Sequence, residues 1–532
     1  MSPTILVWLL VIPFVGGMLS WQSERYSRFV PRWIALFTQL IVLAMSVWLW
    51  FVGDFTLATP TATPAFALEY KAAWIPSFGI NFHLGLDGLA LLLIILTNLL
   101  GVMAIGCSWK EIDRYVGFFH LNLLWNLAGV VGVFLALDLF LFFFFWEMML
   151  VPMYFLIALW GHNIPGGKGR IYSATKFFIF TQFSGLIMLL SILALVFFNH
   201  QATGQWSFGY FELLKTARGL DPQIAWWIML GFFLAFAVKM PMVPLHTWLP
   251  DAHSQAPTAG SVDLAGILLK TAAYGMLRFA LPFFPDAMRE IAPFAMGLAA
   301  LSVIYAGVVA FSQTDIKRLI AYSSISHMGF VTLGIFAGTE QALQGVVIQM
   351  IAHGLSAAAL FILCGEIYER LHTRDLRQMG GLWARFPYLP PIMLFFSAAS
   401  LGLPGLGNFV GEFLILTGSY AVSPLFTILC ALGLVLAAVY SLILIQKAFH
   451  GRPQKADAHG HGEADTQYED LNARELGMMA LLMVLLLGLG LYPQPVLDVS
   501  AASMQTVQMI YAESSAAATL PTPAVATTGV AP

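Results

Sequence analysis

The sequence predicts an all-α polytopic membrane protein with about 14 transmembrane helices. Of its 532 residues, 59% are hydrophobic and only 10% are charged, whereas a soluble domain carries about a quarter charged residues. Apolar runs long enough to span a bilayer recur along the chain. Two of these runs are interrupted by Pro and Gly and also carry ionisable residues, and such broken helices indicate an ion pathway.

The predicted spans cover most of the chain. They lie near residues 3–20, 30–52, 84–107, 114–136, 138–160, 172–199, 223–249, 255–280, 287–311, 315–338, 341–369, 388–420, 422–447 and 473–492. The first run lacks a basic n-region and a small-residue cleavage site, so it is predicted to stay in the protein as a span. Outside the spans we expect an outward loop at 53–83, a polar cytoplasmic linker at 450–472 and a disordered tail from about residue 514.

Basic residues divide unevenly between the two sides of the predicted bundle. Most Lys and Arg residues fall in the loops near 25–32, 110–114, 168–170, 317–318, 370–385 and 447–474, which are therefore predicted to be cytoplasmic. The opposite loops hold Lys71, Lys215, Arg218, Arg278 and Arg289. This division places both termini on the outer side. The basic residues left inside predicted spans are Lys176, Lys239 and Lys270.

Spans four to eight and nine to thirteen form two sets of five. An odd number per set gives the sets opposite orientations, as in inverted-repeat transporters. The fourth member of each set is broken, by Pro241 and Pro244 in the first and between Leu403 and Asn408 in the second. The chain thus divides into three spans with the outward loop (1–113), a first repeat broken near 240–250 (114–283), an inverted repeat broken near 403–408 (284–449), and the linker, last span and tail (450–532).

Six ionisable residues are predicted near the middle of the membrane, where a charge is costly and usually functional. They are Glu147, Lys239, Lys270, His327, His353 and Glu412. Their common depth suggests a polar, hydrated axis across the protein. The alternative is that some of them, above all the histidines, only stabilise packing. Four further residues near span ends have access or structural roles in this interpretation: Asp138, His246, Asp251 and His253.

Glu147 and Lys239 are candidates for a switchable pair. Burial favours a neutral lysine, whereas a nearby carboxylate favours the charged form, so separating the two would release a proton. At an effective dielectric constant of about 20, a pair at about 4 Å interacts by roughly 4 kcal/mol. Lys270 follows Asp263 by seven residues on one helix face, so a neutralised pair is the alternative to a proton relay there. Histidines titrate near neutral pH and can pass protons onward.

The sequence offers no evident cofactor site. Cys107, Cys364 and Cys430 lie far apart in or beside apolar runs, so they are not expected to hold an iron–sulfur cluster, a zinc ion or a disulfide framework. His459 and His461 in the polar linker permit a metal site, but a solvated linker is strongly favoured as their explanation. The formal net charge of −3 argues against nucleic acid as a partner.

Three long motifs resemble the antiporter-like subunits of respiratory complex I. They are Lys239-Met-Pro-Met-Val-Pro-Leu-His-Thr-Trp-Leu-Pro-Asp-Ala-His253 with Ala256-Pro-Thr-Ala-Gly-Ser-Val262, Trp146-Glu-Met-Met149, and Asp315-Ile-Lys-Arg-Leu-Ile-Ala-Tyr-Ser-Ser-Ile-Ser-His-Met-Gly329. The resemblance covers residues 80–450. A fourth stretch, Leu401-Gly-Leu-Pro-Gly-Leu-Gly-Asn-Phe-Val-Gly-Glu412, is similar to the family member that carries glutamate where its two sister subunits carry lysine.

The resemblance implies a proton channel in which Glu147 and Lys239 modulate, Lys270, His327 and His353 relay, and Glu412 is the terminal group. The chain would then be a non-redox, proton-translocating subunit of NADH:quinone oxidoreductase in a bacterial inner membrane. FMN, iron–sulfur clusters and quinone would belong to partner subunits, and the two sister subunits, other membrane subunits and lipid would be its neighbours. The alternatives are a subunit of a multisubunit cation/proton antiporter of related fold and a structural scaffold.

Overall fold

The computed structural model describes residues 2–55, 62–163, 168–451 and 469–519, and these ranges are almost entirely helical. The helices, with short π and 3-10 segments marked η, are α1 (Ile5–Ser23), α2 (Val30–Val52), η1 (Pro76–Phe78), α3 (Gly88–Glu111), α4 (Val116–Leu135), α5 (Leu139–Met148), α6 (Leu150–Trp160), α7 (Arg170–Thr203), α8 (Tyr210–Arg218), α9 (Pro222–Lys239), α10 (Trp248–Gln255), α11 (Thr258–Asp263), η2 (Leu264–Leu268), α12 (Leu269–Gly275), η3 (Met276–Ala280), α13 (Leu281–Phe283), α14 (Pro285–Ser312), α15 (Ile316–Ala337), α16 (Glu340–Leu371), η4 (Leu382–Ala384), α17 (Leu389–Ser400), α18 (Gly407–Tyr420), α19 (Pro424–Phe449), α20 (Ala473–Leu491) and α21 (Gln494–Thr519).

The predicted polytopic all-α fold is confirmed. Within the described residues, 13 helical stretches are long and apolar enough to cross a membrane. The remaining predicted span, at 388–420, is built from α17 and α18, which are separated by a break at 401–406. Two of the 13 stretches combine shorter segments, α5 with α6 and α11 through α13. The inverted relation between the two sets of five spans stays a prediction.

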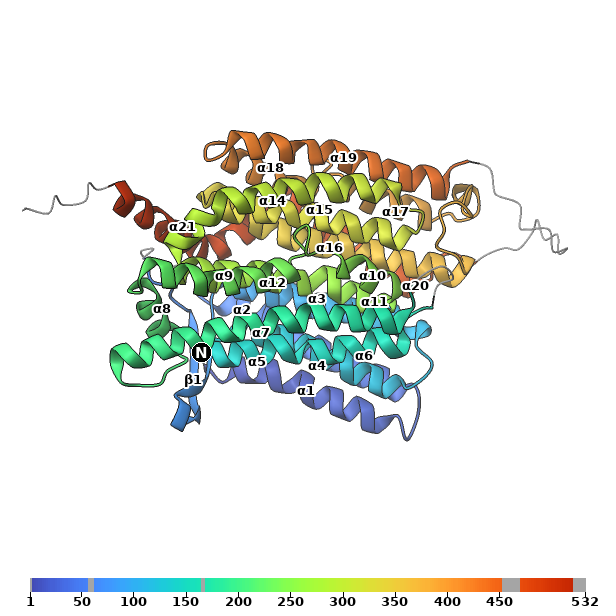
Figure 1. Cartoon of the computed structure of the whole chain (residues 1–532). Coiled ribbons are helices and arrows are strands. Elements are labelled where there is room, and N and C mark those ends of the chain that lie inside the picture. Colours follow the sequence, from blue (N-terminus) through green and yellow to red (C-terminus); the bar gives the residue numbers. More distant parts are fainter. Residues whose placement is uncertain (1, 56–61, 164–167, 452–468, 520–532) are drawn as a thin grey trace, which may run out of the picture.

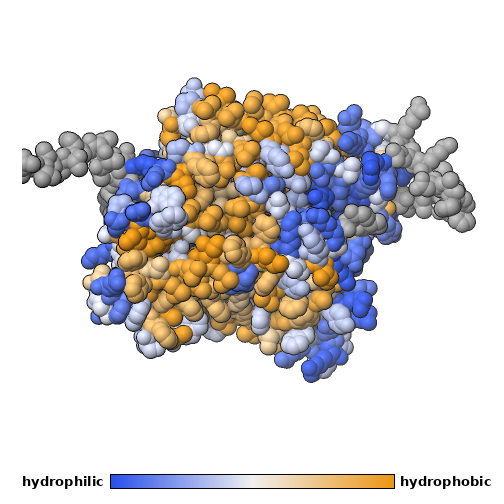
Figure 2. Space-filling model, viewed as in Figure 1, coloured by the Kyte–Doolittle hydropathy of each residue, from blue (hydrophilic) through white to orange (hydrophobic). Residues whose placement is uncertain are grey.

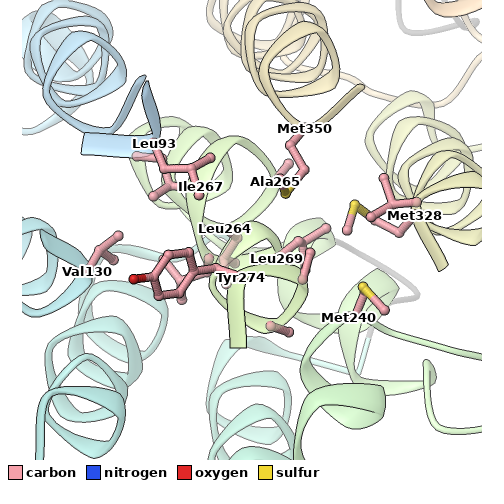
Figure 3. Close-up of a cluster of buried hydrophobic side chains, with 14 of the residues drawn as sticks. Leu93, Val130, Met240, Leu264, Ala265, Ile267, Leu269, Tyr274, Met328 and Met350 are labelled. Carbon is pink, nitrogen blue, oxygen red and sulfur yellow. The ribbon is translucent and has the colours of Figure 1, made fainter. Parts of the chain in front are cut away.

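The helices are stacked from the bottom to the top of the view in Figure 1. Helix α1 lies lowest, helices α4 to α7 lie above it, and α18 and α19 lie at the top. The stretch from Thr258 to Phe283 runs through the interior, and every residue in it is buried. Figure 3 shows its η2 and α12 segments enclosed by side chains that include Leu93 of α3, Val130 of α4, Met328 of α15 and Met350 of α16. The central helix is thus shielded on several sides by other helices of the same chain.

The outer helices expose large apolar side chains along their length. Figure 2 shows hydrophobic residues over the middle of one face and hydrophilic residues at the ends of the helices. Exposed examples are Trp48 of α2, Phe183 and Leu190 of α7, and Val435 of α19. An aqueous surface would not favour such an extended apolar face, whereas a bilayer or a neighbouring membrane subunit covers it.

A β-hairpin lies where a loop was expected at 53–83. Strands β1 (Leu68–Ile75) and β2 (Ile80–Leu86) pair antiparallel, with Leu68 opposite Leu86 and Ile75 opposite Ile80. The hairpin, α8 and α21 gather at the same end of the bundle, on the left of Figure 1. Helix α21 extends to Thr519, so the prediction of disorder from about residue 514 was wrong for the first residues of that tail. His459 and His461, like most of the predicted linker, lie outside the described residues.

Proline explains the interruptions of three spans. Pro152 removes a backbone donor and crowds the carbonyl of Met148, which is where α5 gives way to α6. Pro241 and Pro244 fall in the non-helical stretch between α9 and α10, and Pro404 falls in that between α17 and α18. Lipid cannot satisfy backbone groups freed in this way, so such breaks must be buried in protein or hydrated.

Candidate functional site

The six predicted ionisable residues come from six different helices. They are Glu147 of α5, Lys239 at the last position of α9, Lys270 of α12, His327 of α15, His353 of α16 and Glu412 of α18. All except Glu147 are at most 3% exposed. Isolated buried charges are costly, so each of these groups requires nearby polar or aromatic partners.

Lys270 and His353 form a direct contact in the core of the bundle. The Nζ atom of Lys270 lies 2.8 Å from Nδ1 of His353. The same ammonium also donates to the backbone carbonyl of Ala265, which belongs to the π-helical segment η2. A π turn bonds residue i to i+5 and is frequent at functional sites. The lysine is therefore held between a carbonyl of its own helix and an imidazole of α16.

His327 and Glu412 form the second direct contact. Nδ1 of His327 lies 2.7 Å from Oε1 of Glu412. On its other side, Nε2 of His327 lies 3.1 Å from Oγ of Ser400 and 3.2 Å from the Tyr440 hydroxyl. The Gln349 amide donates to the same Oε1 over 2.9 Å. Both ring nitrogens of His327 thus have partners, and one of them is a carboxylate.

The two contacts are neighbours through their histidines. The rings of His327 and His353 have centroids 5.4 Å apart and are tilted by 51°. Nε2 of His353 has no hydrogen-bond partner among the described residues. Four of the six predicted residues therefore follow one another in the order Lys270, His353, His327, Glu412, with a single unbonded step between the two imidazoles.

Lys239 contacts an aromatic ring. Its Nζ lies 3.8 Å from the centroid of the Trp146 ring and 4.0 Å from Sδ of Met149. Within the described residues no ion pair of 4.0 Å or less joins it to Glu147, whose carboxylate has the Gln182 side chain as a polar neighbour but no hydrogen bond of good geometry. The structure thus holds the proposed pair in a separated arrangement. Lys239 ends α9, where the helix dipole favours a cation.

Asp263 and Lys270 do not pair, although they are seven residues apart. Asp263 accepts from the side-chain amide of Asn126, and its other oxygen has no partner among the described residues. The π segment Leu264–Leu268 lies between the two residues. It has more residues per turn than an α-helix, so positions seven apart leave a common face. This removes the alternative of a neutralised pair in this conformation.

A second polar cluster lies at the end of the bundle opposite the hairpin. Asp251 of α10 contacts Lys176 of α7 at 2.7 Å and Arg318 of α15 at 3.0 Å. Beside it, a cavity of about 350 Å³ is lined by Glu111, Lys317 and other polar residues. His253, expected to be an access or structural residue, stacks on Phe361 with no hydrogen-bond partner for either ring nitrogen in the described part of the chain.

Comparison with known proteins places the chain in a family. A family model described as NADH:quinone oxidoreductase/Mrp antiporter, TM, matches residues 136–438. The chain belongs to this family. It is 63% identical over 506 residues to NADH-quinone oxidoreductase subunit M of Pseudomonas aeruginosa, covering 95% of this chain and 97% of that protein. It is 59% identical over 510 residues to subunit M of Escherichia coli, covering 96% and 99%.

Solved structures agree with the family assignment. A chain of respiratory complex I from Thermus thermophilus with bound NADH superposes with a TM-score of 0.83 at 30% identity, covering 95% of this chain and 99% of that chain. A chain of the Mrp complex from Dietzia sp. has a TM-score of 0.79 at 20% identity, covering 96% and 100%. The second likeness concerns the fold alone.

Sequence reasoning missed several partners of the ionisable residues in this member of the family. Gln349, Ser400 and Tyr440 surround His327 and Glu412, but nothing in their sequence context distinguishes them from ordinary polar residues of a span. Trp146 had a signal, since it directly precedes Glu147 in the motif. Within the described residues, no group of three or more His, Cys, Asp or Glu side chains is arranged to hold a metal ion.

Proposed function

We propose that this chain is the M-type, proton-translocating membrane subunit of an NADH:quinone oxidoreductase. The single observation that carries the proposal is the buried succession of Lys270, His353, His327 and Glu412. A lysine, two imidazoles and a carboxylate in contact can each bind and release a proton, and the heavy-atom distances of 2.7 to 2.8 Å within the two contacts suit proton transfer.

A proton moves along this succession by exchange between neighbours. Lys270 protonates Nδ1 of His353, and the proton held at Nε2 of His353 passes toward His327. His327 in turn delivers a proton from Nδ1 to Oε1 of Glu412. The break between α17 and α18 lies beside Glu412 and frees backbone groups, which favours water next to the carboxylate. Glu412 is therefore the terminal group of the route.

The distance between Glu147 and Lys239 controls whether Lys239 carries a charge. When the two are in contact, the carboxylate stabilises the ammonium; when they are apart, burial favours proton release. The redox work belongs to partner subunits, which hold FMN, iron–sulfur clusters and quinone, and the two sister antiporter-like subunits are neighbours in the membrane. The chain lies in the bacterial inner membrane. The end of the bundle that carries most Lys and Arg residues faces the cytoplasm, and both termini lie on the outer side.

Two neutral variants test the function. Lys239→Ala and Glu147→Gln are expected to assemble normally, judged by native gel, and to lose most proton pumping and coupled quinone reduction, whereas Glu147→Asp is milder. Pumping is followed with a pH-sensitive dye in inverted vesicles. Near-normal pumping by either neutral variant would contradict the proposal.

The second candidate function is a subunit of a multisubunit cation/proton antiporter, favoured by the likeness in fold to a chain of the Mrp complex. Purification of the tagged chain from native membranes in mild detergent separates the two. Flavin and iron–sulfur absorbance that co-purifies with the chain supports the oxidoreductase. A complex without them, together with cation-dependent proton exchange, supports the antiporter.

A further inference from the structure

In the separated arrangement, Lys239 and Glu147 each have a specific neighbour of their own. The ammonium of Lys239 lies over the Trp146 indole, 3.8 Å from its centroid. A desolvated cation over the face of a tryptophan is stabilised by the ring quadrupole. Trp146 is fully buried and is held in turn by Phe236, with ring centroids 5.5 Å apart. The Trp146 ring is therefore held in place and offers a fixed binding position for the Lys239 ammonium.

The carboxylate of Glu147 lies in a space left by a glycine. A Cβ atom added to Gly185 of α7 would lie 1.9 Å from Oε1 of Glu147, whereas ordinary contacts begin near 3.4 Å. An alanine at 185 would thus have to displace the carboxylate by about 1.5 Å. Gly185 is buried in the middle of a long regular helix, where glycine is otherwise unfavourable. The missing side chain is explained by the space that Glu147 occupies.

We propose that Trp146 and Gly185 are positioning residues that stabilise the separated state of the Lys239 and Glu147 pair. The Trp146 ring holds the ammonium away from the carboxylate, and the recess at Gly185 holds the carboxylate away from the ammonium. Trp146 directly precedes Glu147 in the chain, so a rotation of the end of α5 moves both contacts together. This inference rests on the proposed function, because it assumes that the pair switches during turnover.

The recess predicts a rescue between two positions. Gly185→Ala is expected to lower pumping by up to about a hundredfold, the loss that a misplacement of about 1 Å can cause. Glu147→Asp shortens the side chain by one C–C bond, about 1.5 Å, which matches the displacement that alanine requires. The double variant Gly185→Ala/Glu147→Asp should therefore pump as well as Glu147→Asp alone. Gly488→Ala is the matched control, because a Cβ there meets no atom within 4 Å.

The ring predicts a change in pH dependence that loss of packing would not produce. Glu147 and Asp263 are the acidic groups whose charges act on Lys239, and Trp146 adds a stabilising contact to the charged lysine. Trp146→Leu should move the alkaline limb of the pumping profile to lower pH, because the charged lysine loses that contact. Trp146→Phe keeps an aromatic face and should lie between the wild type and the leucine variant.

The experiment measures proton pumping and quinone reduction in inverted vesicles for these variants, with Lys239→Ala alongside. If Lys239→Ala pumps normally, the proposed function fails. If Lys239→Ala is defective while Gly185→Ala matches Gly488→Ala and the pH profile of Trp146→Phe and Trp146→Leu is unchanged, the positioning inference alone is overturned. Absence of rescue in the double variant, with Gly185→Ala defective, also overturns it.

Discussion

Replacing His353 distinguishes a proton relay from a polar packing element. His353 is the residue through which Lys270 reaches His327, by a contact of 2.8 Å on one side and a ring separation of 5.4 Å on the other. His353→Leu removes the acceptor of the Lys270 ammonium and leaves it the Ala265 carbonyl. Loss of a hydrogen bond to a charged group costs about 1.5–3 kcal/mol, so the variant is expected to fold with reduced stability and to stop pumping.

His353→Ala removes the same nitrogen atoms but leaves room. A water molecule enters a cavity when the space is sufficient and two to four polar partners are present, and Lys270 and His327 both border the His353 ring. The alanine variant is therefore expected to pump more than the leucine variant, although it removes more side-chain volume.

Pumping is measured as the ratio of protons moved to NADH oxidised in inverted vesicles, and stability as the temperature at which the detergent-solubilised complex loses this subunit. His120→Leu is the matched control, since His120 is a buried histidine of α4 outside the proposed route. If His353→Leu pumped at the wild-type ratio, the relay would be refuted. It would also be refuted if His353→Ala had both less pumping and lower stability than His353→Leu, because that order follows side-chain volume alone.

Three further predictions concern the ends of the bundle. Arg278 of η3 and Asp87 form a buried ion pair, and the Ser503 hydroxyl of α21 donates a hydrogen bond of 2.8 Å to Asp87. Asp87→Ala should lower the stability by about 3–5 kcal/mol, because it leaves the Arg278 charge buried without a partner. The loss would be measured as a lower dissociation temperature, which Ser503→Ala should change little. Burial holds the pKa of His83 below its ordinary value of 6.5, although Glu69 raises it. The hairpin is thus most stable above that value and weakens as the pH falls through the lower folded-state pKa, so the protection of amide hydrogens in 68–86, relative to their intrinsic exchange rates, should fall as the pH drops below 6.5, and His83→Gln should remove the change. A single cysteine at position 377, where the native side chain is 71% exposed, should be labelled only from the cytoplasmic side, and labelling from outside would contradict the proposed orientation.

The membrane spans and two of their breaks could be predicted from sequence because both have local causes. Apolar length determines a span, and Pro241, Pro244 and Pro404 fall where helices end, although Pro13 and Pro293 lie inside continuous helices. The hairpin was missed although residues 68–71 and Ile80–Leu86 alternate between apolar and non-apolar residues, because the surrounding Pro, Thr and aromatic residues indicated a loop. Helix α21 was missed because its Ala- and Ser-rich composition resembles a disordered tail, and its contact through Ser503 depends on tertiary structure.

Six candidate residues could be named from the sequence, but their contacts could not. A charge in the middle of an apolar run is conspicuous in a single sequence, whereas the buried Lys317 and Glu366, nearer helix ends, were not named as candidates. The partners of the six residues depend on how helices pack: Lys239 contacts Trp146, and Lys270 contacts His353. The π segment Leu264–Leu268 also changes which residues of the central helix share a face, and no simple spacing rule anticipates it.

Glu412 provides the most direct test of the central claim, that protons pass through the buried succession of side chains. Glu412→Gln keeps an acceptor for His327 and Gln349 in the same place but cannot bind and release a proton, so it changes the chemistry with little change in packing. The measurement is the ratio of protons pumped to NADH oxidised in inverted vesicles, with assembly checked by native gel. The account predicts normal assembly and loss of most pumping for Glu412→Gln, and a substantial part retained by Glu412→Asp. A glutamine variant that pumped at the wild-type ratio would contradict it.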